Sequence, residues 1–295
     1  MKDYIISAGT TADLSYEHFK RRNISYIDFY FNLDGVEYID DLGRTMSFSD
    51  FYKKMAEGAM SRTSQPNTEQ FIAYFTPFLE AGKDVIHLSL SSALSGEFNS
   101  ARLAKEELEE KYPDRKIFII DSKAASGGFG LLVDKLADLR DEGMDITKLA
   151  AWTEQNKLRL NHWFYTTDLK YFVRGGRLTK LSGFMGNLLN INPLLHVNEL
   201  GELIPKYKVV GQRRVQIKTL DLVRELADGG LEYADKVYIN HAEMLSDALS
   251  LERTIKNRFK NVTEIVINYI GTTIGAHTGP GTVAIFFWGK ARDEN

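Results

Sequence analysis

Short apolar runs alternate with amphipathic stretches through the first half of the chain. Apolar runs at residues 4–7, 85–90 and 117–120 are typical of buried β-strands, and residues 98–112 and 131–142 carry apolar side chains at helical spacing. A strand followed by a polar loop, a helix and another strand is the pattern of a right-handed βαβ unit. The first half is therefore predicted to form a Rossmann-like parallel sheet covered by helices.

The same half contains a predicted hairpin and two further predicted helices. Residues 29–39 predict a hairpin, because their Asp-Gly pair supports positive φ in a tight turn. Aromatic residues recur at helical spacing near residues 49–57. Another helix is expected to follow a cap at Asn67 or Thr68, since both side chains suit that position.

The second half has a different order of elements, in which strands outnumber helices. A hairpin is expected from residues 193–197 and 203–209. The other expected strands lie at residues 162–166, 236–240, 264–270 and 282–288. Helices are expected at residues 181–189, 215–226 and 245–259. This pattern predicts a second α/β domain with a mixed sheet, and we divide the chain into domains at residues 1–160 and 161–295.

The composition excludes several classes of partner and chemistry. A chain of 295 residues with a formal charge of −3 is large enough for two domains, and its charge argues against nucleic acid or an anionic membrane as the main partner. Without cysteine it has no disulfide, thiol nucleophile or thiolate metal site. It begins without a signal-peptide pattern, and no apolar run approaches the ~20 residues of a membrane helix. A soluble cytoplasmic protein with no integral membrane segment is expected.

Three polar segments that lie far apart in the chain carry the candidate chemistry. They concentrate hydroxyl groups, glycines and one histidine in tight loops, at residues 62–66, 89–96 and 275–281. None of them contains the acid, base or metal-ligand cluster of an ordinary active site. Neutral donors on loops suit the binding of an anion or carboxylate better than the breaking of a bond. This favours a binding protein with no catalytic residue, cofactor or metal.

Two of these segments precede predicted helices of the first half. Backbone N–H groups at a helix start are unpaired, so an anion there gains hydrogen bonds and the helix dipole. Ser95 can point at such an anion, and Gly96 lets the backbone approach it closely. Thr63 and Ser64 precede the other helix, so both loops are expected at one carboxyl edge of the sheet. The alternative is that these hydroxyl groups only cap their helices.

His277 and Arg177 are candidates for the same site. His277 lies among three glycines and a proline, where a constrained loop suits a hydrogen bond to a ligand. Arg177 follows two glycines and can pair with a carboxylate or phosphate. A structural histidine and a surface arginine are the alternatives. The pair Asp40-Asp41 could bind a cation, although two acids in a turn are usually only solvated, and residues 127–130 resemble a dinucleotide loop only loosely.

Together, and in the same order, these segments resemble motifs of the DegV family of bacterial lipid-binding proteins. The resemblance spans essentially the whole chain. The matching segments are residues 63–66 (TSQP), 91–96 (SSxLSG), 120–122 (ending in DS), 174–177 (GGR), 188–193 (LLNIKP) and 275–281 (GAHTGPG).

The resemblance implies a two-domain α/β fold that binds one long-chain fatty acid in a deep apolar tunnel. The carboxylate would be held by Thr63, Ser64, Ser95, Gly96 and His277, with Arg177 and Thr278 completing the polar mouth. The acyl tunnel would include Phe184, Leu188, Leu189, Ile191 and Leu194, although as core these residues would look the same. The best-understood members resemble the carrier subunit of a fatty acid kinase, which presents the carboxylate to a separate ATP-dependent kinase for acyl-phosphate formation.

The chain departs from the family pattern at three places. Residue 9 is glycine where the family opens its first motif with aspartate. Glu97 stands where the family typically has threonine, and its charge should weaken a bound anion unless the side chain faces solvent. Val210 replaces an arginine in the segment that resembles the kinase-docking surface, so lipid binding is better supported than a kinase partner.

Two other functions remain open at this stage. In the first, the protein is a serine hydrolase or transferase acting on an acyl or phosphoryl substrate, with Ser95 as nucleophile and His277 as its base. In the second, it is a regulator whose lipid occupancy controls binding to another protein.

Overall fold

A four-stranded parallel sheet forms the N-terminal part of the fold. The computed structural model describes residues 3–178 and 191–293. The strand order of this N-terminal sheet is β2-β1-β6-β7, and all three pairings are parallel. Its strands are β1 (Tyr4–Gly9), β2 (Ser25–Ile27), β6 (Asp84–Ser89) and β7 (Ile117–Asp121). Three of them lie where the apolar runs predict strands, whereas β2 is too short to stand out in the sequence.

Helices cover both faces of the N-terminal sheet. Helices α3 (Thr68–Glu80) and α4 (Glu97–Lys111) pack on one face, and α5 (Ser126–Asp141) and α6 (Ile146–Asn156) pack on the other. Successive residues of a strand point to opposite faces of the sheet. Val85 therefore packs in the core under α3 and α4, whereas Ile86 packs in the core under α5. Asn67 caps α3 as predicted. The sequence patterns missed α6 and α1 (Tyr16–Arg21).

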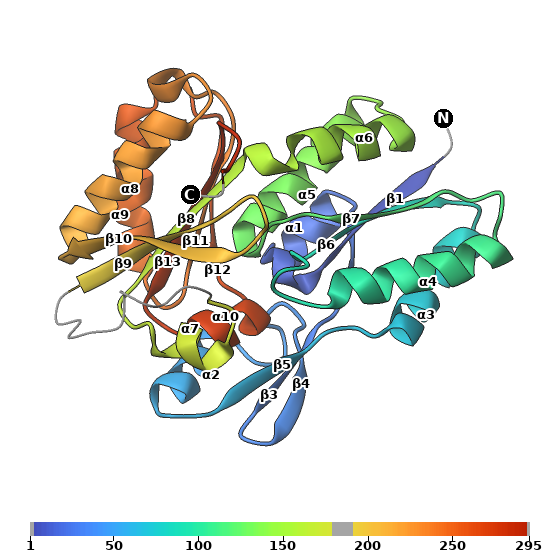
Figure 1. Ribbon diagram of the computed structural model, residues 1–295, viewed down its shortest axis with the longest axis horizontal. Helices are drawn as coiled ribbons and strands as arrows, with labels where there is room; N and C mark the ends of the chain where they lie inside the picture. Colours follow the sequence, from blue (N-terminus) through green and yellow to red (C-terminus); the bar gives the residue numbers. More distant parts are fainter. Residues whose placement is uncertain (1–2, 179–190, 294–295) are drawn as a thin grey trace.

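A six-stranded mixed sheet forms the C-terminal part of the fold. Its strand order is β10-β9-β8-β13-β11-β12; β11 and β12 pair in parallel and the other neighbours are antiparallel. The strands are β8 (Leu160–Thr166), β9 (Ile191–Val197), β10 (Leu203–Val210), β11 (Val237–His241), β12 (Ile265–Tyr269) and β13 (Thr282–Trp288). The two sheets confirm the predicted two-domain α/β class (Figure 1).

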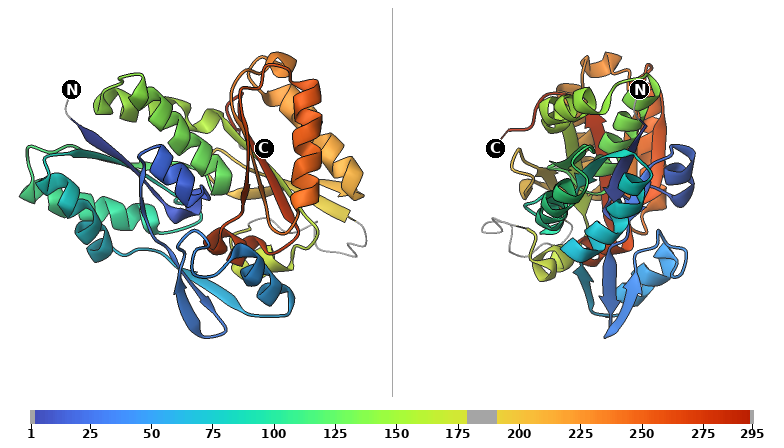
Figure 2. Two further views of the ribbon diagram at one scale, coloured as in Figure 1. Left: turned by 180° about the vertical axis from the view of Figure 1, so that it is seen from behind. Right: turned by 90° about the vertical axis from the view of Figure 1, so that its right-hand side faces the viewer.

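Helices α8 (Gln212–Leu226) and α9 (Leu245–Arg258) cover the outer face of the C-terminal sheet. Viewed from behind, these orange helices and the cyan and green helices α3 and α4 lie on opposite outer sides of the molecule (Figure 2). The six strands of this sheet and the helices α8 and α9 match the predicted ones to within a few residues. The predicted helix at 181–189 lies outside the described residues.

Helix α5 lies between the two sheets and contacts β1, β8, β11 and β13. Its first turn contains Gly127 and Gly128, which precede residue 131, the predicted start of the helix. A Cβ at Gly127 would lie 2.1 Å from Asn240 Oδ1, and one at Gly128 would lie 2.2 Å from His162 Nε2. The glycines therefore allow the helix to approach the C-terminal sheet closely. The predicted start of this helix at residue 131 was wrong, because the helix begins at Ser126.

A third, three-stranded sheet of order β4-β3-β5 lies beside the two main sheets. Its strands are β3 (Tyr30–Leu33), β4 (Val36–Ile39) and β5 (Ser61–Ser64), so the predicted hairpin is confirmed. Three helices pack around it: α2 (Phe48–Ala56), α7 (Lys170–Gly175) and α10 (Thr272–Thr278). Short 3₁₀ turns complete the structure, at Thr10–Ala12, Lys157–Arg159 and Gly230–Glu232.

Three segments expected as loops are partly regular. Ser61–Ser64 is strand β5, which pairs with β3, so Thr63 lies opposite Phe31. His277 lies in α10 and not in a loop, because the helix continues to Thr278 before Gly279 adopts a φ of 70°. Helix α7 includes Arg174 and Gly175. These elements are short and depend on packing against distant residues, which local patterns do not record.

Candidate functional site

A cavity of about 280 Å³ lies where the N-terminal sheet, the C-terminal sheet and the three-stranded sheet meet. Both halves of the chain contribute to its wall. The apolar lining residues are Phe29, Leu90, Leu94, Ala125, Phe164, Phe172, Val197, Leu203, Ile270, Ile274, Ala284 and Phe286. The polar ones are Thr63, Ser64, Gln65, Ser95, Ser126, His162, Arg177, Thr273, His277, Thr278 and Thr282.

The inner face of the C-terminal sheet forms the floor of this cavity. Thr282, Ala284 and Phe286 alternate along β13, so their side chains point to the same face. His162 and Phe164 have the same relation on the neighbouring strand β8. The two strands pair antiparallel, with Ala284 opposite Phe164. The floor is therefore largely apolar.

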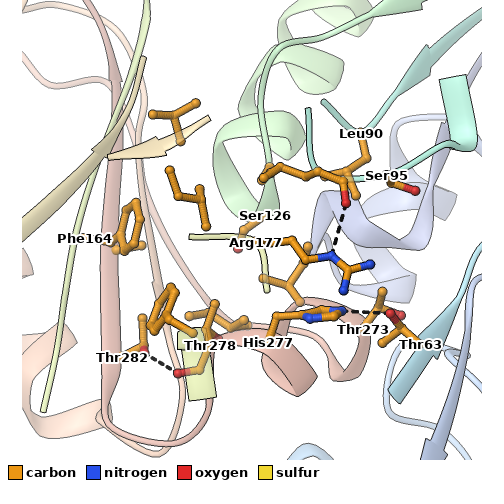
Figure 3. A pocket seen from close by; sticks show the side chains of 18 of the residues that line it. Thr63, Leu90, Ser95, Ser126, Phe164, Arg177, Thr273, His277, Thr278 and Thr282 are labelled. Atoms are coloured by element: carbon orange, nitrogen blue, oxygen red, sulfur yellow. Dashed lines mark hydrogen bonds between the residues drawn. The ribbon is translucent and has the colours of Figure 1, made fainter. Parts of the chain in front are cut away.

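Thr63, His277, Arg177 and Ser95 gather at the opposite end of the cavity, whereas Thr278 lies on the floor side beside Thr282 (Figure 3). Thr63 comes from β5 and His277 from α10, and Thr63 Oγ1 lies 2.8 Å from His277 Nε2. Arg177 reaches across this end, where its Nη1 donates to the Gly175 carbonyl at 2.7 Å and its Nε lies 3.4 Å from the Leu94 carbonyl. Residues more than a hundred positions apart thus form one polar mouth.

Gln65 joins the two hydroxyl-bearing segments at this mouth. Ser95 Oγ donates to Gln65 Oε1 at 2.7 Å, and Gln65 Nε2 donates to Ser100 Oγ at 3.2 Å. Ser95 Oγ also accepts the Glu97 N–H at 3.2 Å at the start of α4. Gly96 is the N-cap of α4, so the hydroxyl of Ser95 accepts the first N–H of the helix and also lines the cavity.

The electrostatic character of the cavity favours an anion at the mouth. Among the described residues that line it, Arg177 carries the only full charge and no carboxylate is present. Burial lowers the pKa of His277 to about 4, and the nearby positive charge of Arg177 contributes to the shift. His277 is therefore neutral at pH 7. The mouth offers one exposed cation and several neutral hydrogen-bonding groups.

The side chain of Glu97 neither faces solvent nor lines the cavity, and it is 0% exposed. Oε1 lies 3.1 Å from His87 Nε2, and Oε2 accepts the Leu90 N–H at 2.7 Å. The carboxyl group is thus hydrogen-bonded beneath the loop and is not part of the cavity wall.

The structure brings together most, but not all, of the predicted site residues. Thr63, Ser64, Ser95, His277, Arg177 and Thr278 line the cavity, whereas Gly96, Ile191 and Leu194 are not among the described residues of its wall. Leu194 and Val197 are three positions apart on β9, so they point to opposite faces, and Val197 is the one at the cavity. Phe184, Leu188 and Leu189 lie outside the described residues.

Sequence reasoning missed the residues that form most of the apolar wall. Phe164, Ala284 and Phe286 lie in strands that were predicted, but a strand pattern does not show which face borders a cavity. Ser126 and Thr273 gave no signal, because their positions depend on contacts with residues far away in the sequence.

The geometry does not place a base on the proposed serine nucleophile. Ser95 Oγ is bonded to Gln65, and His277 Nε2 is bonded to Thr63. Across residues 3–178 and 191–293, no hydrogen bond joins Ser95 to a histidine. No group of three or more metal-ligating side chains is found in that part of the chain either. None of its helices is long and apolar enough to cross a membrane.

The fold and the cavity define a two-domain α/β protein with a largely apolar cavity between the domains that ends in a polar mouth. A model of the family described as "Uncharacterised protein, DegV family" matches residues 5–290, and the chain belongs to this family.

Known proteins similar to this chain agree with that assignment. A DegV domain-containing protein of Clostridium perfringens is 37% identical over 99% of this chain and 100% of its own length. A fatty acid-binding protein of Thermotoga maritima is 32% identical over 94% of this chain and 95% of its own. The structure of a fatty-acid-binding DegV family protein from Thermus thermophilus matches 98% of this chain and 100% of its own, with 27% identity and a TM-score of 0.87.

Proposed function

We propose that this protein binds one long-chain fatty acid in the cavity between its domains. The carboxylate lies at the mouth, near Thr63, Ser64, Ser95, His277 and Arg177, and the acyl chain follows the apolar wall. The observation that carries the proposal is the division of one cavity into an apolar wall and a mouth whose described residues include a cation and no carboxylate. A fatty acid has the same division. The similarity to fatty-acid-binding members of the family supports it.

The energetics favour tight binding of the acyl chain and weak polarisation of the carboxylate. Burying about 16 methylenes would contribute roughly 13 kcal/mol at ~0.8 kcal/mol each. Ordering the flexible chain and losing overall motion remove a large part of that gain. At the mouth, neutral His277 and the hydroxyl groups of Thr63 and Ser95 stabilise a carboxylate without supplying a base. We therefore infer a carrier that contributes no catalytic group.

Lipid extraction combined with mass spectrometry tests the carrier function. The purified protein should contain up to one fatty acid per chain, or should take up added oleate to that ratio. Replacing Thr63 by Val and Ser95 by Ala should lower the oleate affinity at least about a hundredfold, because two hydrogen bonds to a charged group are lost at ~1.5–3 kcal/mol each. The matched control replaces Ser92 by Ala and Thr147 by Val, which lie outside the cavity wall. Equal affinities of the two double variants would contradict the proposed carboxylate site.

We further propose that the bound carboxylate is presented to a separate ATP-dependent fatty acid kinase, which forms the acyl phosphate. This proposal rests on the family resemblance and on the mouth, where Ser64 and Arg177 are exposed. Oleate-loaded protein incubated with ATP alone should give no acyl hydroxamate after hydroxylamine trapping. Addition of the catalytic subunit of a fatty acid kinase should produce it. Hydroxamate formed with ATP alone would show that the chain itself is an enzyme.

A further inference from the structure

A second cavity, of about 260 Å³, lies on the other side of the wall that closes the lipid cavity. Four separate segments meet there: residues 10–15, 40–48, 241–245 and 267–271. Its lining residues are Thr10, Asp13, Leu14, Ser15, Asp40, Leu42, Phe48, His241, Leu245, Ile267, Asn268, Tyr269 and Gly271. The proposed fatty-acid site does not use this cavity.

Two buried carboxyl groups give the second cavity its acidic character. Asp13 is 5% exposed and Asp40 is 2% exposed, and no lysine or arginine is among the described residues of the wall. Ser126 Oγ donates to Asp13 Oδ2 at 2.5 Å, and the Thr273 N–H donates to Asp40 Oδ2 at 3.1 Å. The backbone of Gly271 also hydrogen-bonds Asp13, and the backbone of Leu42 hydrogen-bonds Asp40. Burial raises the pKa of Asp13 well above its ordinary value, and the neighbouring Asp40 raises it further. Burial also raises the pKa of Asp40, so a bound cation would favour the charged form of both groups.

The cavity also contains a buried histidine with an unused nitrogen. His241 is 2% exposed, and its Nδ1 has no hydrogen-bond partner among residues 3–178 and 191–293. Burial lowers the pKa of His241, so the ring is neutral and can accept a hydrogen bond. Buried polar atoms of this kind are nearly always paired, so an unpaired one points to a missing ligand or water.

Aromatic rings complete the wall around these groups. The Tyr269 ring lies 4.5 Å from that of His241 and 5.3 Å from that of Phe48, measured between centroids. Aromatic faces attract cations, and carboxyl groups accept their N–H hydrogens. The combination of two acids, a neutral imidazole and a short row of rings is therefore suited to an organic cation.

We propose that this second cavity binds a small organic ammonium ion, held by Asp13 and Asp40 and covered by the rings of Phe48 and Tyr269. An inorganic metal ion fits less well, since the described residues gather no group of three metal-ligating side chains. An anion would meet two carboxyl groups and no cation. A volume of about 260 Å³ is just below the ~300 Å³ at which drug-sized pockets begin, so the ligand is small.

Ligand-detected NMR on the full chain, with propylammonium as the probe, tests the site. Saturable binding is expected for propylammonium, and binding at least about tenfold weaker is expected for 1-propanol, because hydrogen bonds to a charged group are stronger than neutral ones. Magnesium chloride should not displace the amine. Absence of saturable amine binding, equal binding of the alcohol or displacement by magnesium would overturn the proposal.

Single substitutions test whether propylammonium binds in this cavity. Asp40→Asn keeps the acceptor for the Thr273 N–H and should bind propylammonium about tenfold more weakly. Asp41→Asn removes the same charge one position away, outside the wall of the cavity, and should bind normally. If Asp40→Asn does not fold, Phe48→Leu tests the ring instead and should weaken amine binding several-fold while leaving 1-propanol unchanged. Unchanged amine affinity in the folded Asp40→Asn and Phe48→Leu variants would assign the binding to another surface.

Discussion

The buried carboxyl group of Glu97 is expected to hold the loop that carries Ser95. Leu90 ends the strand side of this loop and Glu97 begins α4, so the hydrogen bond from Leu90 N–H to Glu97 Oε2 closes the loop at both ends. The contact with His87 continues inward, since His87 Nδ1 lies 2.9 Å from Ser7 Oγ and Ser7 Oγ lies 3.0 Å from the Tyr74 hydroxyl. Ser7, His87 and Glu97 are all 0% exposed.

Glu97→Ala removes the acceptor of the Leu90 N–H and the partner of His87 Nε2 at once. The Leu90 N–H and His87 Nε2 would remain buried without partners, at ~1–3 kcal/mol each. Breaking a buried pair by removing one member costs about 3–5 kcal/mol, which agrees with that sum. We therefore expect the free energy of unfolding to fall by about 4 kcal/mol, and the melting temperature to fall by roughly 10 °C, since a domain of this size loses about 2–4 °C per kcal/mol.

Glu97→Gln separates hydrogen bonding from charge. Its carbonyl oxygen still accepts the Leu90 N–H, and its amide can donate to His87 Nε2 if the imidazole moves its hydrogen to Nδ1, toward Ser7. Glu97→Gln should therefore recover most of the stability and the oleate affinity that Glu97→Ala loses. Lipid dissociation should be faster in Glu97→Ala, because the loop that positions Ser95 is no longer closed.

The assay compares thermal unfolding and oleate dissociation in three variants. Glu107→Ala, on an exposed position of the same helix, is the matched control and should resemble the unmodified protein. A loss of less than about 1 kcal/mol in Glu97→Ala would refute the closure argument, since a surface substitution has that effect. If Glu97→Gln were as damaging as Glu97→Ala, the charge of Glu97 and not its hydrogen bonds would hold the loop.

Three further expectations concern the cavity itself. The pKa of His277 is about 4 in the folded protein, below the ~6.5 of a histidine in the unfolded chain, so only the unfolded state gains a proton between these pH values. The stability that neutral His277 contributes, up to about 3 kcal/mol, should therefore be lost as the pH falls from 6.5 to 4. His277→Gln should flatten the pH dependence of the melting temperature. Arg177→Gln should weaken oleate binding about fivefold, as expected for an exposed pair worth ~1 kcal/mol, whereas Arg174→Gln should bind normally in the same titration. Ala284→Phe narrows the floor and should shift the extracted fatty acids toward shorter chains; an unchanged chain-length profile would show that the acyl chain does not reach β13.

Much of the fold could be predicted because long elements repeat their pattern several times. The strands β6, β7 and β13 and the helices α4, α8 and α9 each carry a clear run or period, and the structure contains them within a few residues. Elements of six or seven residues, such as α1, α7 and α10, complete too few turns to show a period. The start of α5 was missed for another reason. Its glycines lower helix propensity, and only the contact with Asn240 and His162 explains them.

The site could be predicted at its mouth but not along its wall. Residues at the mouth stand out because hydroxyl groups and glycines cluster there, as at Ser95 and His277. Wall residues such as Phe164 and Phe286 look like any core residue of a strand, since burial against a cavity and burial against a helix select the same side chains. Glu97 shows the same limit for charged groups. Its partners His87 and Leu90 are close in sequence, yet only the fold turns its side chain inward.

The arrangement of the mouth also accounts for how a carrier could hold a lipid firmly and still release it to another protein. The acyl chain would be covered by side chains from both halves of the chain, so most of the binding energy would come from a part of the ligand that no partner needs to reach. Ser64 and Arg177 are exposed at the mouth, so the carboxylate would be accessible there. Among the described residues, the hydrogen-bond partners of Arg177 are the carbonyl groups of Gly175 and Leu94, so a partner's carboxylate or phosphate could draw it away without breaking an ion pair to that part of the chain. Release of the head group would then be governed at the surface, separately from the apolar contacts inside.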